Sequence, residues 1–585
     1  MKTVALISGG KDSCFNMMHC VANGHEITSL ANLHPPSNGQ DEMDSWMFQT
    51  VGHDIIQLYS DAMELPLFRQ RIDGSNIQQD LHYNQSQGDE TEDLYKLLSK
   101  VLDELPDTQA VSVGAIASNY QRLRVENVAS RLGLTVLSYL WERDQTELLR
   151  EMASNGMEAI LIKVACVGLT SKHLGQSLAQ IEGRMAALKD KYQVHPCGEG
   201  GEYETIVLDC PLFKKKLSIT DRQVVHLESD TAYLKLQGEI QDKEDYKGDW
   251  KKSLLQAGKL EDVYQHLLNQ LRDIPATSDL PSSPANRVTK PPRNETQPTG
   301  TYANDIFTCT SYHITASSPT LSTLLPEDKS NILFCTLVLR DMSDFSAVNA
   351  QYGQLWTTSH PPSRVCYSTT LPDPTHYSLY TISVNPNHIE RDRRLWVQSR
   401  SYWAPSNIGP YSQITISRGL AFISGQIGLV PASMRLPDSV EEEIVWSLQS
   451  LGRVMQSMKV EHWSGVLLCY ILDGRWRDHV EFAFNHVLGD ENLRLIVVQM
   501  VEGSQLPRGA QVEWQFIASD PEGDVQVSAT VDLMDRNDLL MRIDAIRDYV
   551  QADPIWQLHV NKLWMSGHAE EQIGLRILDK HKQAE

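Results

Sequence analysis

This sequence has few cysteines for its length and no long apolar run. Its 585 residues include nine cysteines, none in a C-x-x-C pair. A zinc or iron–sulfur site and a disulfide framework are therefore not expected, and a reducing cytoplasm is the expected location. No apolar run reaches the roughly 18 residues of a membrane span. Nor does a basic segment with an apolar stretch and cleavage site follow Met1, so we expect no secretory signal and no membrane association.

The sequence is also short of basic residues. Lysine and arginine number 52 against 75 aspartates and glutamates, which gives a net charge of −23 at pH 7. Because a polyanionic partner requires a basic surface, this balance weakens an RNA-binding assignment, and no direct nucleic-acid partner is expected. A local basic patch would still permit one. The chain is too long for a single core, so we expect about three or four domains.

What the sequence does contain is a glycine-rich turn near its start. The apolar run 3–7 predicts a buried strand, and 14–22 predicts a helix. A strand that turns through glycines into a helix N-terminus is an anion site, because backbone N–H groups and the helix dipole favour negative charge. Lys11 adds a positive charge and the serines add donors. The predicted phosphate-binding residues are Ser8, Gly9, Gly10, Lys11, Asp12 and Ser13. A tight turn with a surface lysine is the alternative.

This hexapeptide differs from the G-x-x-x-x-G-K-[ST] loop of γ-phosphate transfer. It matches the pyrophosphate loop of enzymes that split ATP between its α and β phosphates. Those enzymes activate a carboxyl or carbonyl group as an adenylate and release pyrophosphate. ATP and Mg²⁺ are the expected cofactors, and Lys11 and Asp12 are the expected catalytic residues of the loop.

Residues 1 to about 235 alternate apolar strands with amphipathic helices. Further strands are expected at 26–33, 110–116, 135–140 and 159–165, and helices at 46–63, 120–132 and 146–154. Such alternation predicts an α/β domain with a doubly wound parallel sheet. Ligands of these sheets bind at the carboxyl ends of the strands, where the glycine-rich loop lies.

The rest of the chain is expected to form four further segments. Residues 274–300 are rich in proline, serine, threonine and asparagine and predict an exposed linker, so 236–300 is assigned to a helix and this linker. Two β-rich domains are expected at 301–396 and 398–533. A charged, mostly helical tail is expected at 534–585.

A second cluster of polar residues runs from Gly114 to Glu126. It follows a strand and opens a helix, so it is expected at the same ligand-facing edge, with Ser118 or Asn119 capping the helix. Arg122 and Glu126 are four residues apart and can instead pair on the surface. The predicted substrate-binding residues here are Ser118, Asn119, Tyr120, Gln121, Arg122, Arg124 and Glu126.

A third cluster, His195-Pro-Cys-Gly-Glu-Gly-Gly-Glu-Tyr-Glu-Thr205, crowds three carboxylates into one loop. Like charges repel unless a metal or a cationic ligand neutralises them, so the loop is predicted to close on substrate and hold Mg²⁺, ammonium or a leaving proton. An acidic surface turn is the alternative. Glu202 and Glu204 are candidates to position Mg²⁺ or deprotonate ammonium. The other predicted substrate-binding residues are Glu199, Gly200, Gly201, Tyr203 and Thr205.

Cys197, in the same loop, raises the possibility of a thiol nucleophile. No paired base can be identified in the sequence, and buried cysteines are common, so we do not assign it a catalytic role. No set of protein ligands for a resident metal is assigned either.

The three clusters SGGKDS, GAIASNYQRLRVEN and HPCGEGGEYET, in this order, resemble the diphthine–ammonia ligase family over roughly residues 1–235. WMFQTVGHD and LPLFR, at 46–54 and 65–69, are similar to that family too, and GEGGEYET separates it from other pyrophosphate-loop enzymes. The resemblance implies an adenine nucleotide alpha hydrolase-like (HUP-type) fold. It also implies ATP-dependent activation of the carboxylate of diphthine, a modified histidine on elongation factor 2. Ammonia then displaces AMP in the last step of diphthamide biosynthesis.

A second resemblance covers the C-terminal half. The segments 404–413, 423–429 and 506–513 resemble the Rid/YjgF family of small trimeric α+β (chorismate-mutase-like) domains, some of which hydrolyse imines. The segments 338–349 and 361–364 resemble the same family's middle and end. A homo-oligomer through these domains is therefore possible.

Each Rid-like repeat holds only part of the family's site. Arg364 lies in the first repeat, whereas Tyr411, Ser424 and Gln426 lie in the second. In that family the ligand pocket lies between subunits, so we hypothesise one composite carboxylate-binding pocket. Two relic half-sites in an assembly module are the alternative.

Two other functions stay open. An adenylating tRNA-modifying enzyme would need a basic RNA surface, and thiolation usually needs paired cysteines. A metabolite-sensing protein, in which the Rid-like repeats have the main role, would bind ATP without sustained AMP formation.

Overall fold

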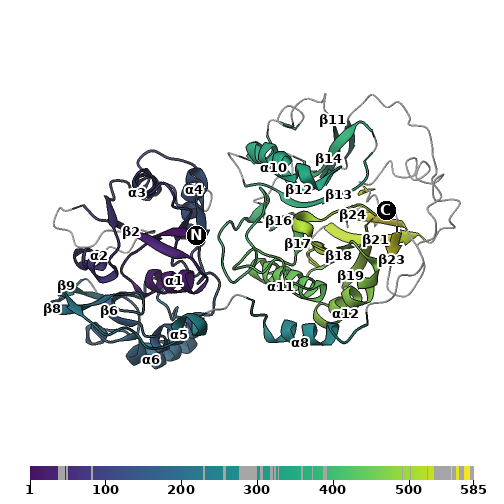
Figure 1. The fold of residues 1–585 in the computed structure, drawn as a ribbon. Coiled ribbons are helices and arrows are strands. Elements are labelled where there is room, and N and C mark those ends of the chain that lie inside the picture. The colour runs from purple at the N-terminus through teal and green to yellow at the C-terminus, as the bar shows by residue number, and fades with distance from the viewer. Residues whose placement is uncertain are drawn as a thin grey trace. The chain divides into compact units, whose positions relative to one another are not determined.

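The structure, a computed structural model, divides into two compact units (Figure 1). Unit 1 comprises Met1–Gly258, Gln398–Ser406 and Pro431–Ser433; unit 2 comprises Lys259–Val397, Asn407–Val430 and Met434–Glu585. The structure describes all residues except 37–46, 48–50, 81–82, 228–230, 255–257, 276–298, 304–306, 316–320, 322–324, 327, 357–359, 372, 386–391, 490–491, 501, 523–524, 533–554, 557–561, 565–571 and 580–585. Most of the expected linker 274–300 thus lies outside the described residues.

Unit 1 begins with a five-stranded parallel sheet. Its order is β3 (Leu67–Arg71), β2 (Glu26–His34), β1 (Lys2–Leu6), β4 (Ala110–Ser112) and β5 (Thr135–Leu137), and every neighbouring pair is parallel. The strand order reverses between β1 and β4. Loops that leave these two strands therefore diverge at the carboxyl edge, which opens a crevice for a ligand.

Helices cover both faces of this sheet. Ala5 of β1 belongs to the core that contains α1 (Lys11–Ala22), whereas its neighbour Val4 belongs to the core that contains α3 (Glu90–Glu104) and α4 (Asn119–Leu132). Successive side chains of a strand point to opposite faces, so the two cores lie on opposite sides of the sheet. The predicted doubly wound α/β architecture is confirmed.

A second sheet of unit 1 is antiparallel. Its order is β7 (Tyr203–Asp209), β6 (Glu158–Val164), β9 (Ala232–Asp242) and β8 (Lys215–His226). The strand expected at 159–165 therefore forms, but the expectation that it extends the parallel sheet is wrong. An apolar run indicates that a strand is buried and carries no information about its partner. Along the chain, α5 (Gln145–Ser154) precedes β6, and α6 (Leu178–Tyr192) lies between β6 and β7.

The remaining helices of unit 1 are short. They are η1 (His53–Ile55), α2 (Leu58–Met63), η2 (Ser171–His173) and α7 (Trp250–Leu254). The continuous helix expected at 46–63 is wrong over its described part, because Gly52 has a φ of +83° and breaks the chain into a turn, the 3₁₀ helix η1 and α2.

Unit 2 contains two sheets with the same strand arrangement. The first has the order β10 (Thr299–Ala303), β11 (Phe307–Thr315), β14 (Thr375–Val384), β12 (Ile332–Leu339) and β13 (Ser363–Ser368). The second has the order β15 (Arg393–Leu395), β16 (Ile414–Ser417), β17 (Leu420–Ile427), β20 (Val512–Ser519), β18 (Ser464–Ile471), β19 (Leu493–Gln499) and β23 (Lys562–Trp564). β12 is parallel to β13 and antiparallel to β14, as β18 is to β19 and β20. This correspondence fits two α+β repeats.

The two sheets of unit 2 share one core. Phe334 of β12 stacks on Phe422 of β17 with ring centroids 5.6 Å apart, and both belong to the same buried cluster. The described residues of unit 2 form the helices α8 (Asp262–Leu271), η3 (Met342–Asp344), α10 (Phe345–Gly353), η4 (Gln354–Trp356), α11 (Val440–Met458), η6 (Gly474–Trp476), α12 (Arg477–Val487) and η7 (Pro507–Gly509).

The C-terminal tail differs from the expected helical one. Its described residues form β22 (Ile555–Trp556), β23 and β24 (Gln572–Asp579), and β24 pairs with β21 (Val525–Asp532) and β22 in a three-stranded sheet. The charged composition of the tail favoured a helix. The observed strands form because β24 pairs with the distant strand β21, and no local pattern in the sequence encodes that pairing. Within the described part of the chain, no helix combines the length and apolarity that crossing a membrane requires.

Candidate active site

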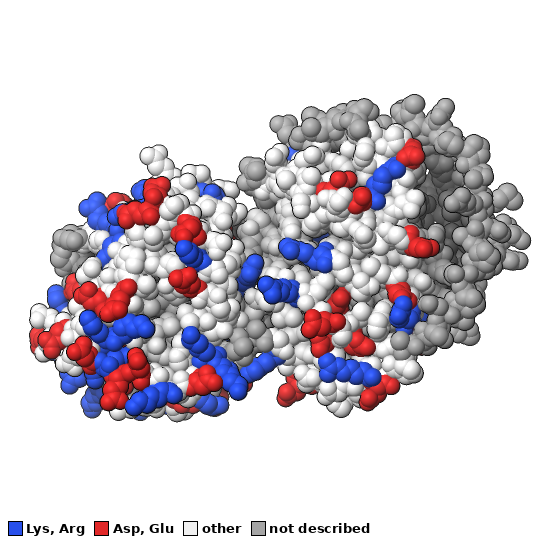
Figure 2. All heavy atoms as spheres, viewed as in Figure 1, with Lys and Arg blue, Asp and Glu red and all other residues white. Residues whose placement is uncertain are grey.

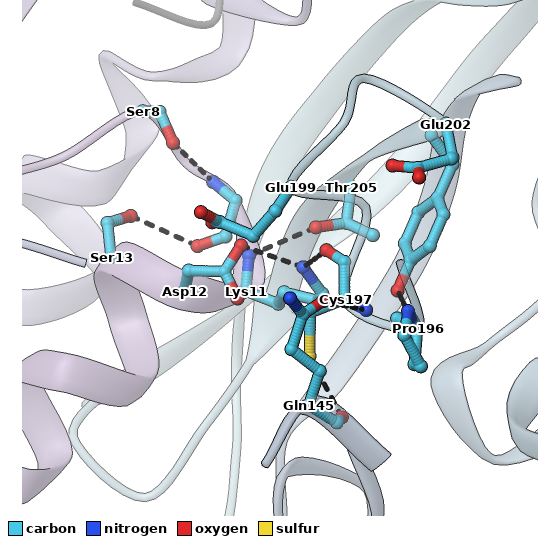
Figure 3. Close-up of polar contacts among 12 residues, drawn as sticks. Ser8, Lys11, Asp12, Ser13, Gln145, Pro196, Cys197, Glu199, Glu202 and Thr205 are labelled. Atoms are coloured by element: carbon cyan, nitrogen blue, oxygen red, sulfur yellow. Dashed lines mark hydrogen bonds and ion pairs between the residues drawn. The ribbon is translucent and has the colours of Figure 1, made fainter. Parts of the chain in front are cut away.

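The glycine-rich loop joins the end of β1 to the first turn of α1 (Figure 3). Gly9 has a φ of +84°, and a Cβ atom there would lie 2.4 Å from Ile56 Cδ1 and 2.6 Å from Ile206 Cδ1, so only glycine fits. Gly10 precedes α1 as its N-cap and has no side chain that could cap the helix. The helix dipole and the first-turn amides therefore face the loop, which is the arrangement of an anion site.

The two serines of the loop contact its backbone. Ser8 Oγ accepts a hydrogen bond from Gly10 N at 3.2 Å, and Ser13 Oγ donates to Gly10 O at 3.0 Å. These bonds fix the shape of the turn. The predicted role of both hydroxyls as donors to a ligand stays a prediction.

Lys11 lies almost completely buried at the centre of the site, with 2% of its surface exposed. Its Nζ lies 2.7 Å from Asp12 Oδ2 and also donates to Cys197 O. Burial by itself disfavours the ammonium, but the Asp12 carboxylate outweighs that effect, and the pKa of Lys11 is raised above its usual value. Lys11 is therefore a fixed positive charge that protein groups hold in place when no anion is present.

The backbone of Lys11 connects the first and third clusters. Lys11 N donates to Thr205 Oγ1 at 3.0 Å, although 194 residues separate them in the chain. Tyr203 packs its ring 5.2 Å from Lys11 Nζ, and its hydroxyl donates to Pro196 O. The loop 195–205 is thereby held against the glycine-rich loop.

The three carboxylates of the loop 195–205 have different surroundings. Glu202 accepts hydrogen bonds from His195 N and Gly200 N, both at 2.8 Å, and so closes the loop on itself. Glu204 pairs with Lys163 of the neighbouring strand β6 at 3.2 Å. Gly200 and Gly201 lie exposed at the loop tip. A partner for Glu204 is thus present but distant in sequence, which is why the sequence did not reveal it.

Glu199 is the carboxylate that faces the glycine-rich loop (Figure 3). Burial and the nearby Asp12 raise the pKa of Glu199, and Ala117 N donates to its Oε2 at 3.1 Å. Asp12 Oδ1 is buried and has no hydrogen-bond partner among the described residues. Two carboxylates thus lie beside Lys11, and one oxygen of Asp12 has no described partner. Within the described residues, no cluster of three or more His, Cys, Asp or Glu side chains forms a metal site.

The second cluster divides into an accessible half and a buried half. Ser118 caps α4 by accepting from Gln121 N at 3.3 Å, and Asn119 is exposed, so the helix start faces outward. Tyr120 and Gln121 are half-buried. This half borders the loop that carries Glu199.

The buried half is occupied by contacts within unit 1. Arg122 forms a 2.8 Å ion pair with Glu126, and the two side chains are 2% and 1% exposed. Arg124 is completely buried and donates to Gln78 O and Asp80 O. The pairing of Arg122 with Glu126 that the sequence left open is therefore observed, in the interior rather than on the surface. The predicted substrate contacts of these three residues stay untested.

Cys197 is not placed as a nucleophile. Its thiol donates to Gln145 O at 3.2 Å, and burial raises its pKa to about 12, so the thiolate is scarce near neutral pH. Cys197 contributes its backbone carbonyl to the site, and this carbonyl accepts a hydrogen bond from Lys11 Nζ.

In unit 2, residues of both repeats surround Arg364. Its guanidinium carbon lies 4.8 Å from the ring centroid of Tyr352 and 5.5 Å from that of Tyr411. Ser424 Oγ accepts from Arg364 N at 2.8 Å, and Gln426 Nε2 donates to Ser424 O at 3.0 Å. The four residues predicted for a composite pocket thus lie together.

The sequence analysis missed Glu513 in this cluster. It is 3% exposed, and burial raises its pKa to about 8 despite the opposing charge of Arg364. Among the described residues, neither Glu513 Oε2 nor Arg364 Nη1 has a hydrogen-bond partner. The signal that could have revealed Glu513 in the sequence is its position as the single acidic residue of the largely apolar strand β20.

The fold and the site define unit 1 as a doubly wound α/β unit with a glycine-rich loop at a helix N-terminus. Family models described as "Diphthamide synthase N-terminal domain" and "Diphthamide synthase C-terminal domain" match residues 1–136 and 144–239. A model described as "Endoribonuclease L-PSP" matches residues 402–519.

Relatives extend this match to most of the chain. A diphthine–ammonia ligase of Schizosaccharomyces pombe is 42% identical over 91% of this chain and 90% of its own length. A diphthine–ammonia ligase of Homo sapiens is 53% identical over 42% of this chain and 94% of its own length. The chain therefore belongs to the diphthine–ammonia ligase family of enzymes. Among solved structures, RidA from a Psychrobacter species is 21% identical with a TM-score of 0.19, over 20% of this chain and 94% of that one.

Proposed function

We propose that this chain is an ATP-dependent ligase that completes diphthamide. It would activate the carboxylate of diphthine on elongation factor 2 as an adenylate, release pyrophosphate, and transfer the acyl group to ammonia with release of AMP. The observation that carries the proposal is the buried Lys11 at the N-terminus of α1, held against the loop 195–205 by Cys197 O and Thr205. The names of the relatives, both diphthine–ammonia ligases, support the substrate and the amine.

Lys11 would exchange protein partners for phosphate. Its ammonium contacts one carboxylate oxygen and one carbonyl, and entering phosphate oxygens would replace these contacts with charge-assisted hydrogen bonds. The amides of Gly9 and Gly10 and the dipole of α1 would bind the remaining phosphate charge. The α-phosphate would then lie at the carboxyl edge between β1 and β4, near the accessible start of α4.

Asp12 and Glu199 fit a divalent cation that accompanies ATP. Asp12 Oδ1 is buried without a described partner, and the pKa of Glu199 is raised in part by the charge of Asp12, so a shared cation would relieve both. Mg²⁺ bound there would neutralise phosphate charge. Glu202, which closes the loop, and Glu204, which pairs with Lys163, are proposed to shape the ammonia side.

The decisive experiment is mass spectrometry of elongation factor 2 from cells that lack this protein. We expect diphthine to accumulate and diphthamide to return when the parent chain is expressed. Lys11→Ala should fail to restore it, whereas Lys100→Ala, an exposed lysine on α3, should succeed. Unchanged diphthamide in the deletion strain would refute the proposal. We propose the cytoplasm as the place of action, because elongation factor 2 works there.

An adenylating tRNA-modifying enzyme is less well supported. On the face that Figure 2 colours, lysine and arginine side chains are intermixed with aspartate and glutamate. The tRNA alternative needs a basic surface to hold a polyanion.

We propose a second function for unit 2, binding of a small carboxylate between the repeats. Arg364 Nη1 and Glu513 Oε2 are buried without described partners, and a carboxylate would accept from the first and from the protonated form of the second. Pyruvate and benzoate serve as probes in ligand-observed NMR. We expect binding by the parent chain and loss of binding in Arg364→Lys, whose ammonium lacks the planar fork. Equal binding by both chains would refute a composite site.

A further inference from the structure

A short segment from the C-terminal half of the sequence completes unit 1. Residues Gln398–Ser406 belong to unit 1, although they open the segment 398–533 that the sequence assigns to the second Rid-like repeat. The edge strand of the parallel sheet, β5, pairs through Leu137 with Arg400 in parallel register. Ser138 N donates to Arg400 O, and Arg400 N donates to Val136 O, both at 2.8 Å. The segment therefore forms a single β-bridge with the open edge of the sheet.

The first part of this segment contacts α4. Glu126 Oε1 accepts hydrogen bonds from Gln398 N at 3.0 Å, from Ser399 N at 2.9 Å and from the Ser399 hydroxyl. The other oxygen of Glu126 pairs with Arg122, whose guanidinium lies 4.9 Å from the ring centroid of Trp141. A buried carboxylate needs such donors. The three hydrogen bonds that Glu126 Oε1 accepts come from this segment and not from residues near Glu126 in the sequence.

The second part of the segment contacts α1. The Tyr402 hydroxyl accepts from Asn23 Nδ2 at 2.7 Å and lies 3.1 Å from His19 Nδ1. Its ring packs on Tyr139 with centroids 5.0 Å apart. His19 is in the last turn of α1 and Asn23 is its C-cap, so the segment joins the end of α1 to the middle of α4.

These two helices carry the proposed site at their N-termini. α1 begins at Lys11, and α4 begins after Ala117, which donates to Glu199. Helices are stiff, so a displacement at one end is transmitted to the other. We propose that residues 398–402 form a brace that sets the position of α4 relative to α1, with Ser399 and Tyr402 as positioning residues for the reaction. This inference rests on the proposed function for its kinetic readout only.

The comparison with shorter relatives makes the brace particular to chains of this length. The human relative is matched over 251 residues that make up 94% of its length, so it is less than half as long as this chain. The match to the human relative covers 42% of this chain. A brace supplied from residue 398 onward is a feature of the long form.

The test uses Ser399→Ala, Tyr402→Phe and the double variant in the full chain, with Tyr192→Phe as a control at an exposed tyrosine. Hydrogen exchange of residues 114–121 is read against β18 in unit 2 as an internal reference. We expect about tenfold faster exchange at 114–121 in each single variant, because the loss of a hydrogen bond changes the opening equilibrium by roughly that factor. Exchange in β18 should stay unchanged. The KM for diphthine-bearing elongation factor 2 should rise several-fold while the KM for ATP stays within about twofold.

The double variant distinguishes a brace from two separate contacts. A brace released at either end no longer acts, so the double variant should resemble the worse single variant in both exchange and KM. If the two contacts acted separately, the fold-changes of the single variants would multiply in the double variant. Multiplied effects, or unchanged exchange at 114–121 in both singles, would overturn the proposal. Tyr402→Phe keeps the packed ring, so it remains informative if Ser399→Ala exchanges faster throughout. A parent chain without AMP formation would refute the proposed function and leave the exchange result standing.

Discussion

Replacing Lys11 by methionine should separate the role of its charge in catalysis from its role in stability. The side chain is buried and its ammonium lies 2.7 Å from Asp12 Oδ2. Charge-assisted contacts to phosphate are worth about 1.5–3 kcal/mol each, which corresponds to a loss of roughly 10- to 150-fold in AMP formation. The assay is release of AMP with diphthine-bearing elongation factor 2 as acceptor.

The same substitution should also destabilise the folded chain. Breaking a fully buried ion pair costs about 3–5 kcal/mol, and here the cost should be smaller because the Asp12 side chain that loses its cation is 26% exposed. The pKa of Asp12, already raised by burial, would rise further. A folded-state pKa above the unfolded one means that the folded state binds the proton more tightly. The unfolding free energy of Lys11→Met should therefore fall as the pH rises above about 4.

A second variant isolates the two effects. Lys11→Met combined with Asp12→Asn removes both charges, so most of the stability should return while AMP formation stays low. Chemical denaturation at pH 7 measures the first quantity and AMP release the second. A double variant as unstable as the single one, or a single variant with near-parental turnover, would refute this account of the site.

Three further predictions concern other residues. Gly9→Ala should abolish ATP binding in calorimetry, because the added Cβ would lie 2.4 Å from Ile56 and the φ of +84° disfavours alanine; binding within twofold of the parent would contradict the loop geometry. Glu202→Gln should keep ATP affinity within a few-fold and abolish amidation, and full diphthamide formation would reduce Glu202 to a surface residue. For Glu513, a folded pKa of about 8 against the ordinary 4.5 means that stability is lost as the pH rises between these values, by about 1.4 kcal/mol per pH unit; Glu513→Gln should flatten this slope in denaturation series.

Local patterns were sufficient to predict the strand, turn and helix at the start of unit 1. The strand, the glycine turn and the helix lie within about ten positions of Lys11 in the chain, so their conformations follow from local sterics and periodicity. The alternation of strands and helices further predicted the doubly wound sheet. The same reasoning assigned β6 to that sheet incorrectly, because a buried strand looks alike in either sheet.

Partners of the site residues required the tertiary structure. Thr205 and Cys197 reach Lys11 across more than 180 residues, and Glu204 finds Lys163 on the adjacent strand. The sequence showed three crowded carboxylates; the fold determined that Glu199 alone among them faces Asp12. Electrostatic roles depend on distance in space, which chain order does not give.

The sequence by itself determined which residue types were available and the turns that present them: the hexapeptide at the end of β1, the helix start at Ser118, and the half-sites at Arg364 and Tyr411. Only the tertiary structure decided that Ser399 and Tyr402, far along the chain, close the edge of the first sheet and contact α4 and α1. The reason is physical. Turns and helix starts are set by neighbours within one or two turns of chain, whereas an open strand edge and a buried carboxylate accept any segment that supplies the missing donors, and packing selects which one.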